Sequence, residues 1–453
     1  MMKTSRAHIL PLHRMLILCL TILGMALFPF IVPLRASDHA DPIHLPQGME
    51  IFDDGKPNAM AVAKLAGNTT DLFVFPIKDD GKLADFPRNK GQDLNLQPAE
   101  LAQIKALAVI LCVRPALRKA PPLDLSTYTY SINMDLHSRV LFDKADELGR
   151  YGGSVPDPEK ISSDVTIEIQ LNDDTTLKKQ AIHSPSKLFK NFDNVHVYND
   201  NTLKEKAGEV LRNAGDIHLY TGYKANTFIF PRFFGTNIVA MVMIIPISCF
   251  PEGQQDLLCW ATTSDKNGKQ FDHVGRSLRT QNPRFDLLNT LPPKDHVAAL
   301  KKENENPSLM RDLFVKFGFD NLFEYRPWDF TPDVMIYSSR FNAGYPNGRC
   351  LNDDVAALLA RYGDTLLLEL SYKSPKFPRA TTIDKPFLDE FPYLAEPWPD
   401  SDAKPGPVLS ARNQTIIRIA LGVAIAWALL GLWKLIELLV KFVRVFFKKP
   451  IRA

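Results

Sequence analysis

The chain has 453 residues and a formal net charge of +3, but residues 1–36 hold four basic residues and no acidic one, and residues 434–453 hold six basic residues against one Glu. Residues 37–433 therefore have a net charge of −6, which argues against a basic nucleic-acid-binding surface. With 45% hydrophobic and 10% aromatic residues, the composition also excludes a disordered chain and allows a large core.

The N-terminal segment predicts export. Residues 15–34 form an apolar run that is preceded by Arg14 and followed by Arg35-Ala36. We interpret residues 1–36 as a signal peptide that is cleaved after Ala36. An uncleaved membrane anchor is the alternative, because the run is about long enough to cross a bilayer.

Residues 37–394 predict a mainly β fold with helical insertions, a large antiparallel β-sandwich-like ectodomain. Apolar or alternating runs typical of strands occupy residues 71–76, 107–113, 127–133, 165–171, 237–247 and 257–263. Patterns typical of helices occupy residues 98–106, 203–213, 284–302, 307–318 and 353–362.

Four of the five cysteines follow the leader, and an even number in an oxidising compartment predicts disulfides. Cys249 and Cys259 enclose a short loop, which suits a hairpin closed by a disulfide. Cys112 and Cys350 form the remaining predicted pair.

The C-terminal residues predict attachment to the cell membrane. Residues 395–412 are rich in proline and are interpreted as a stiff stalk. Residues 413–433 predict a transmembrane helix, and residues 434–453 predict a basic amphipathic cytoplasmic tail that lies on the membrane. We expect residues 413–453 to contact lipid, with the ectodomain in the periplasm.

Six segments, in the same order along the chain, resemble an exported bacterial family, domain of unknown function four-three-three-one (DUF 4331). They are Ser37-Asp38-His39, Thr70-Asp71-Leu72-Phe73-Val74-Phe75, Trp260-Ala261-Thr262-Thr263, Asp272-His273-Val274-Gly275-Arg276, Gly344-Tyr345-Pro346-Asn347-Gly348-Arg349 with Asp353-Asp354, and Phe391-Pro392-Tyr393-Leu394. The resemblance covers most of residues 37–398. It implies an exported location and a shared fold, but no reaction.

The chain departs from that family's pattern at two acidic positions. Residues 61–68 replace an acidic run before the strand at Asp71, and Lys224-Ala225-Asn226 replaces an arginine followed by two acids. An ion site built from those acids is therefore in doubt. The membrane helix is an addition to the family's usual pattern.

A first candidate metal site lies at the predicted mature N-terminus. After cleavage at Ala36, a free amine, two amides and the imidazole of His39 could hold Cu²⁺ or Ni²⁺ in a square plane, with Asp38 and Asp41 beside them. The alternative, which we favour, is that these residues form local hydrogen bonds in an N-terminal segment.

A second candidate is Asp353 with Asp354, whose oxygens suit Ca²⁺, helped by Asp71 or Asp384. We favour a structural alternative, in which Asn352 caps the following helix, the two acids stabilise its N-terminus, and Arg349 pairs with one of them.

Asp272 and His273 could form an acid–base pair, but adjacent strand residues face opposite sides, and we expect a surface or turn position for them. The preferred functional hypothesis is a membrane-anchored module that binds an envelope partner. The alternative is a metal-dependent enzyme that uses Asp38, His39 and Asp41 with Asp353 and Asp354.

Overall fold

A computed structural model describes the following residues: 52–53, 56–57, 66–86, 95–117, 124–206, 215–280, 283–307, 312, 315–316, 324–362, 368, 371–374, 376, 378–399 and 411–446. The predicted signal peptide and the Asp38, His39 and Asp41 cluster lie outside these residues.

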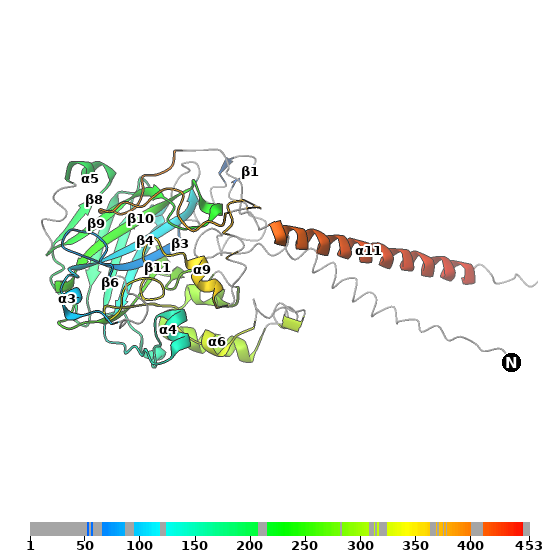
Figure 1. The fold of residues 1–453 in the computed structure, drawn as a ribbon, viewed down its shortest axis with the longest axis horizontal. Helices are drawn as coiled ribbons and strands as arrows, with labels where there is room; N and C mark the ends of the chain where they lie inside the picture. The colour runs from blue at the N-terminus through cyan, green and yellow to red at the C-terminus, as the bar shows by residue number, and fades with distance from the viewer. Residues whose placement is uncertain are drawn as a thin grey trace, which may run out of the picture. The chain divides into compact units, whose positions relative to one another are not determined.

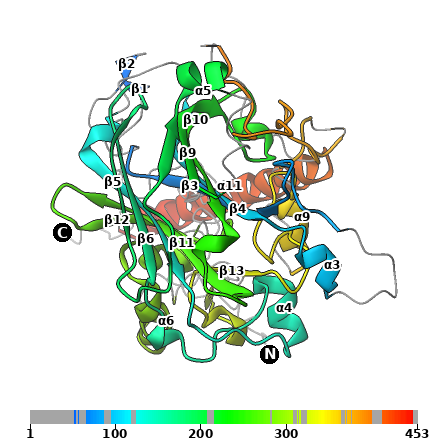
Figure 2. The same cartoon turned by 90° about the vertical axis from the view of Figure 1, so that its left-hand side faces the viewer.

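Two large sheets make up the β-rich part of the chain (Figures 1 and 2). The five-stranded sheet has the order β3 (Thr69–Ile77), β4 (Ala106–Leu117), β10 (Asn237–Pro246), β9 (Ile217–Ala225) and β8 (Val195–Tyr198). The six-stranded sheet has the order β12 (Gln270–Val274), β11 (Asp256–Asp265), β5 (Tyr128–Asp135), β6 (Val165–Leu171) and β7 (Leu177–His183), with β13 (Met335–Ser338) also paired to β11. A small separate ladder joins β1 (Phe52–Asp53) to β2 (Lys56–Pro57).

Side chains of both sheets form one shared apolar core, to which β6 contributes Val165, Ile167, Ile169 and Leu171. Strand β6 is buried at every second residue, as its alternating sequence predicts. Strand β10 is buried along its whole length, because its second face lies in another apolar cluster with Phe73, Phe75 and Tyr393. The continuous apolar run at 237–247 therefore reflects a strand covered on both faces.

The connection between β10 and β11 corrects the predicted hairpin. β10 pairs with β4 and β9, whereas β11 pairs with β5, β12 and β13. The chain between Cys249 and Cys259 thus crosses from one sheet to the other. Cys249 and Cys259, like Cys112 and Cys350, are buried free thiols, so the structure contains neither predicted disulfide.

One further correction concerns strand direction, since β8 and β9 pair in parallel while every other described ladder is antiparallel. The helices of the described residues are mostly short: α3 (Pro98–Leu101), α4 (Ala145–Tyr151), α5 (Asp200–Lys206), α6 (Pro293–Glu305), α9 (Val355–Ala360) and α11 (Ala411–Phe446). Single 3₁₀ turns or short 3₁₀ helices are η1 (Leu125–Thr127), η2 (Pro158–Lys160), η3 (Pro231–Phe233), η4 (Ile247–Cys249), η5 (Pro283–Thr290) and η6 (Pro327–Asp329).

The loop at residues 344–349 connects the outer edges of the two sheets. Arg349 exchanges backbone hydrogen bonds with Val74 of β3 at 3.0 and 3.2 Å, and the N–H of Gly348 donates to Ile336 of β13 at 2.8 Å. Gly348 has a φ of 65°, and a Cβ there would collide with the carbonyl oxygen of Val74. Glycine is required because the loop approaches the strand so closely.

The side chain of Arg349 anchors the same loop. Its guanidinium lies 2.6 Å from the carboxylate of Asp71, and both side chains are almost fully buried. It also stacks 4.1 Å from the ring centroid of Phe73, and Thr227 donates a hydrogen bond to Asp71 at 2.9 Å. Two opposite charges therefore compensate each other in an apolar environment, where either alone would be costly.

The beginning of the predicted stalk packs on the five-stranded sheet. Ala225 donates a backbone hydrogen bond to Ala395 at 3.1 Å. The side chain of Asn237 bonds both backbone groups of Trp398 at 2.7 and 2.9 Å. Residues 395–399 are thus held against β9 and β10.

Helix α11 is long and apolar enough to cross a membrane by its length and composition, and residues 412–441 meet that description. A helix of 36 residues is about 54 Å long, well beyond the ~30 Å hydrocarbon core of a bilayer. It continues without a break past residue 433, where the sequence predicted that the transmembrane helix leads into an amphipathic helix on the membrane. Glu437 pairs with Lys434 and Lys441 on this extension at 2.9 and 2.6 Å.

The buried ion pair gives a test of how the two sheets are held together. Substituting Arg349→Met removes this cation from the buried carboxylate of Asp71, and we expect this to lower the free energy of unfolding by about 3–5 kcal/mol. The measurement is urea unfolding of the full chain in nanodiscs, followed by tryptophan fluorescence.

Arg379→Met is the matched control, because the ion pair between Arg379 and Asp354 is partly exposed and its loss should cost less. The double variant Asp71→Asn with Arg349→Met should recover part of the loss. Equal destabilisation by Arg349→Met and Arg379→Met would show that the buried pair has no special role.

Candidate functional site

Asp353 and Asp354 serve different parts of the structure. Asp353 accepts backbone hydrogen bonds from Tyr345 and Cys350 at 2.8 and 2.7 Å. Asp354 is the N-cap of α9, accepts from the N–H of Ala357 at 3.2 Å and forms an ion pair with Arg379. The helix cap is therefore Asp354 and not Asn352.

The other residues expected around these acids are also engaged elsewhere. Arg349 pairs with Asp71, which removes both from Asp353 and Asp354. Asp384 accepts a hydrogen bond from the N–H of Gly235 at 2.5 Å. Among the described residues, Asp353 and Asp354 do not belong to a group whose ligand atoms converge as a metal site requires. Asp353 and Asp354 thus have structural partners, as the structural alternative expected, but Asn352 is not the cap and Arg349 pairs with neither acid. The Ca²⁺ site stays a prediction.

Asp272 and His273 are buried on β12, which corrects the expected surface position. Asp272 accepts hydrogen bonds from the backbone and hydroxyl of Thr69 at 2.8 and 3.0 Å, which joins β12 to the start of β3. His273 Nε2 lies 2.7 Å from the carbonyl oxygen of Asp333. Burial raises the pKa of Asp272 to about 7 and lowers the pKa of His273. With about 1% of each residue exposed, solvent and substrate have no access to the pair.

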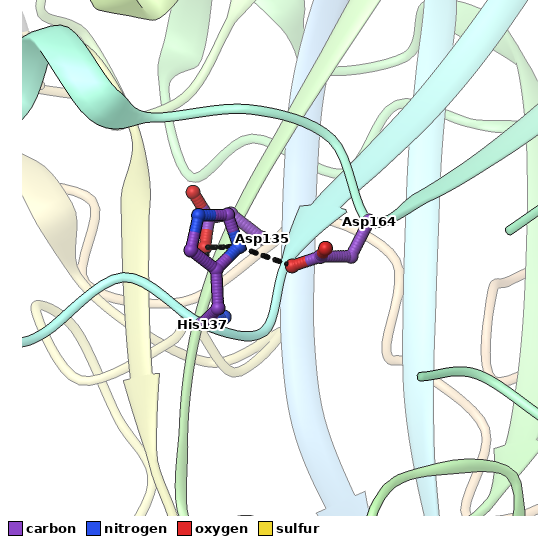
Figure 3. Close-up of side chains that lie close together, drawn as sticks. All are labelled: Asp135, His137 and Asp164. Atoms are coloured by element: carbon purple, nitrogen blue, oxygen red, sulfur yellow. Dashed lines mark hydrogen bonds and ion pairs between the residues drawn. The ribbon is translucent and has the colours of Figure 1, made fainter. Parts of the chain in front are cut away.

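A cluster that the sequence did not reveal lies at the base of the insertion between β5 and β6 (Figure 3). His137 Nδ1 is 2.7 Å from Asp164 Oδ2 and 3.3 Å from Asp135 Oδ1. Both carboxylates are nearly buried, whereas 45% of the imidazole is exposed. Asp135 ends β5 and Asp164 immediately precedes β6, so strand pairing brings together residues that are distant in sequence.

Asp135, His137 and Asp164 are close enough to be ligands of one metal ion, with their ligand atoms within 4.8 Å of one another. The carboxylate oxygens, however, already accept several hydrogen bonds. Asp135 accepts from the backbone of His137, Ser138 and Ser162 and from the hydroxyl of Ser138 at 2.7–3.1 Å, and Asp164 accepts from the N–H of Leu136 at 2.8 Å. A metal would have to displace donors that then lose their partners, at a cost in free energy.

The arrangement is better suited to a cluster of ion pairs that holds the two ends of the insertion at residues 136–164 together. We call the cluster of Asp135, His137 and Asp164 the ionic lock. The hydrogen bond to Asp164 is the main cause that raises the pKa of His137, since a carboxylate favours the imidazolium form. The backbone N–H of Asp164 also donates to Met134 at 2.8 Å. Protonated His137 thus holds the two carboxylates, and with them both ends of the insertion.

A cavity of about 600 Å³ lies beside β3, on the face of the five-stranded sheet that points away from the shared core. Its walls come from three regions of the chain: residues 75–83, residues 350–352 and residues 382–393. The lining residues are Phe75, Lys82, Leu83, Cys350, Leu351, Asn352, Thr382, Ile383, Pro386, Phe387, Leu388, Asp389 and Tyr393. It combines apolar walls with a few polar groups.

The cavity wall formed by residues 382–393 is fixed to the sheet. The hydroxyl of Tyr393 donates to Gly81 at 2.8 Å, and its ring packs edge-on to Phe75 at 5.6 Å. The N–H of Leu388 donates to the carbonyl of Tyr393 at 2.7 Å. Burial strongly raises the pKa of the Cys350 thiol, so the cavity presents a neutral thiol.

A second, polar depression of about 500 Å³ lies near Ser138 and Arg340.

No protein-family model matches the chain, and no curated protein is significantly similar to it. Membership of DUF 4331 therefore stays a prediction that rests on the six motif segments. The structure does give one of these segments a local role, since Gly348 and Arg349 hold the loop between the sheets.

The ionic lock predicts a pH-dependent contribution to stability. A histidine whose pKa is raised in the folded state stabilises that state below its ordinary pKa of 6.5, and the contribution is lost as the pH rises through the folded-state value. His137→Gln should therefore lower the free energy of unfolding at pH 5.5 by about 1 kcal/mol or less, and by less at pH 8.5. Urea unfolding of the full chain at both pH values measures this difference.

His183→Gln is the control, because His183 is an exposed histidine 3.6 Å from Glu168. Equal destabilisation of His137→Gln at both pH values would contradict the lock. Stabilisation of the wild type by a divalent metal, absent in His137→Gln, would show that the cluster is a metal site instead.

Proposed function

We propose that the chain is a membrane-anchored β-sandwich module whose domain faces the periplasm and binds a small, partly apolar molecule in the cavity beside β3. The cavity beside β3 is the observation that supports this proposal. Ligand sites are concave, measure about 300–1,000 Å³ and have mainly apolar walls with a few polar groups. The cavity of about 600 Å³ has this size and character.

The residues that line the cavity suggest the kind of ligand it would bind. One wall is the segment of residues 382–393, which precedes the candidate membrane helix α11 in the sequence. Lys82 and Asp389 are the charged groups of the lining, whereas Phe75, Phe387 and Leu388 supply apolar surface. A ligand with a hydrocarbon or aromatic body and a polar end would match these walls.

The alternative, a metal-dependent enzyme, receives less support from the described residues. Asp353 and Asp354 bind backbone amides and Arg379, and neither carboxylate lies in the cavity lining. Asp38, His39 and Asp41 lie outside the described residues. The copper or nickel site at a free N-terminus remains a separate prediction.

Filling the cavity tests the proposed function. Leu83 and Leu388 line the cavity and are 38% and 43% exposed, so tryptophan at either position can occupy the cavity without disturbing the shared core. We expect Leu83→Trp and Leu388→Trp to reduce the amount of a small molecule that purifies with the full chain by about tenfold, which corresponds to ~1.4 kcal/mol of lost affinity. Solvent extraction followed by mass spectrometry measures the amount of the molecule that purifies with each variant.

Ile247→Trp and Val197→Trp are matched controls, because these residues are 39% and 41% exposed but do not line the cavity. Both controls should retain the molecule. If no molecule is enriched in the wild type over Leu83→Trp, or if all four variants lose it alike, the cavity is not a binding site.

A further inference from the structure

Arg114 lies within β4, where the register with β10 shifts, and has a backbone conformation that is unusual for a residue with a side chain. Its φ is 62°, in the left-handed region that costs an L-residue roughly 1–2 kcal/mol. Its N–H donates to the carbonyl oxygen of Asn68 at 3.0 Å. The next inward-facing residue along β4 is Val113, in the shared core. The left-handed turn allows the long side chain of Arg114 to be buried, with 1% of the residue exposed.

The guanidinium interacts electrostatically with residues of both sheets. These are Tyr130 of β5 and Tyr223 of β9, together with Asp124. Burial lowers the pKa of Arg114 to about 10, although these neighbours oppose the change. The side chain thus remains a cation at neutral pH.

Among the described residues, Arg114 differs from the other two long cationic side chains that are most completely buried. Arg349 pairs with Asp71 at 2.6 Å, and Lys224 pairs with Asp200 and Glu396 at 2.8 and 3.0 Å. No carboxylate of the chain forms an ion pair with Arg114 within the part that the structure describes, and its Nε and Nη2 atoms are buried without hydrogen-bond partners. An uncompensated buried charge costs several kcal/mol, which a native fold rarely tolerates.

Further unpartnered polar side chains occur at the same end of the two sheets. The amide of Asn68 and the hydroxyl of Thr70 are buried without hydrogen-bond partners. Asn68 is the backbone partner of Arg114. Thr70 is the extra residue where the β3–β4 register shifts beside Val113, the residue before Arg114.

We propose that Arg114, with the side chains of Asn68 and Thr70, binds one small monovalent anion inside the end of the two-sheet core. A water molecule could accept the hydrogen bonds but would leave the positive charge uncompensated. A monovalent anion balances one guanidinium, whereas a divalent anion would leave a buried negative charge. Arginine, amide and hydroxyl groups can all donate to the same anion.

The test is thermal unfolding of the full chain in nanodiscs, with sodium bromide or sodium formate replacing sodium gluconate at constant ionic strength. Gluconate is too bulky for a site within the core. A ligand that binds only the folded state raises Tm with the logarithm of its concentration above Kd. We expect this increase in the wild type with bromide, with formate or with both, and its loss in Arg114→Met.

Arg361→Met is the matched control, because Arg361 is an exposed arginine that follows α9, and it should retain the anion response. An equal response in Arg114→Met, or none in the wild type, overturns the proposal. Crystals of the wild type soaked in bromide provide a second measurement that does not depend on the folding of a variant. If bromide raises Tm, an anomalous peak beside the Arg114 guanidinium is expected, and its absence there overturns the site.

Discussion

The ion pair between Asp71 and Arg349 is the contact on which the arrangement of the two sheets depends. It fixes the loop of residues 344–349 to β3, while Gly348 of the same loop bonds β13 of the other sheet. The edge strand β3 is thereby covered instead of being left open to other chains. The same anchor places residues 350–352 next to β3, where they form one wall of the proposed binding cavity. The ion pair between Asp71 and Arg349 thus contributes both to the packing of the sheets and to the formation of the cavity.

Lys224 plays a comparable role for the chain that leads toward the candidate membrane helix α11. Where the resembled family has an arginine, this lysine is buried and pairs with Glu396. Together with the hydrogen bonds between Asn237 and Trp398, it holds residues 395–399 on the five-stranded sheet. The neighbouring residues 382–393 line the cavity. In the proposed function, the ligand would therefore contact residues 382–393. This segment packs on the five-stranded sheet and comes just before residues 395–399 in the sequence.

Buried charge distinguishes structural sites from a candidate ligand site in this domain. Arg349 and Lys224 each pair with carboxylates, and His137 does the same with Asp135 and Asp164 when its imidazole is protonated. Their buried charges are compensated by other residues of the chain. Asp353 and Asp354, which the sequence suggested as metal ligands, likewise have structural partners. Arg114 has no such partner among the described residues, and its Nε and Nη2 atoms lack hydrogen-bond partners, so we propose that an external anion binds there.

The sequence by itself determined the strands at 165–171 and 237–246 and the apolar helix after residue 411, because alternation and continuous apolar runs are local consequences of burial. It did not determine which strands pair. The strands flanking Cys249 and Cys259 looked like a hairpin yet belong to different sheets, since a local pattern specifies a strand and not its neighbour. Likewise, Asp353 and Asp354 were visible as acids, but only tertiary packing decided that they bind amides and Arg379. The cavity depends wholly on tertiary structure, because Phe75, Cys350 and Leu388 meet only when distant segments cover the same strand.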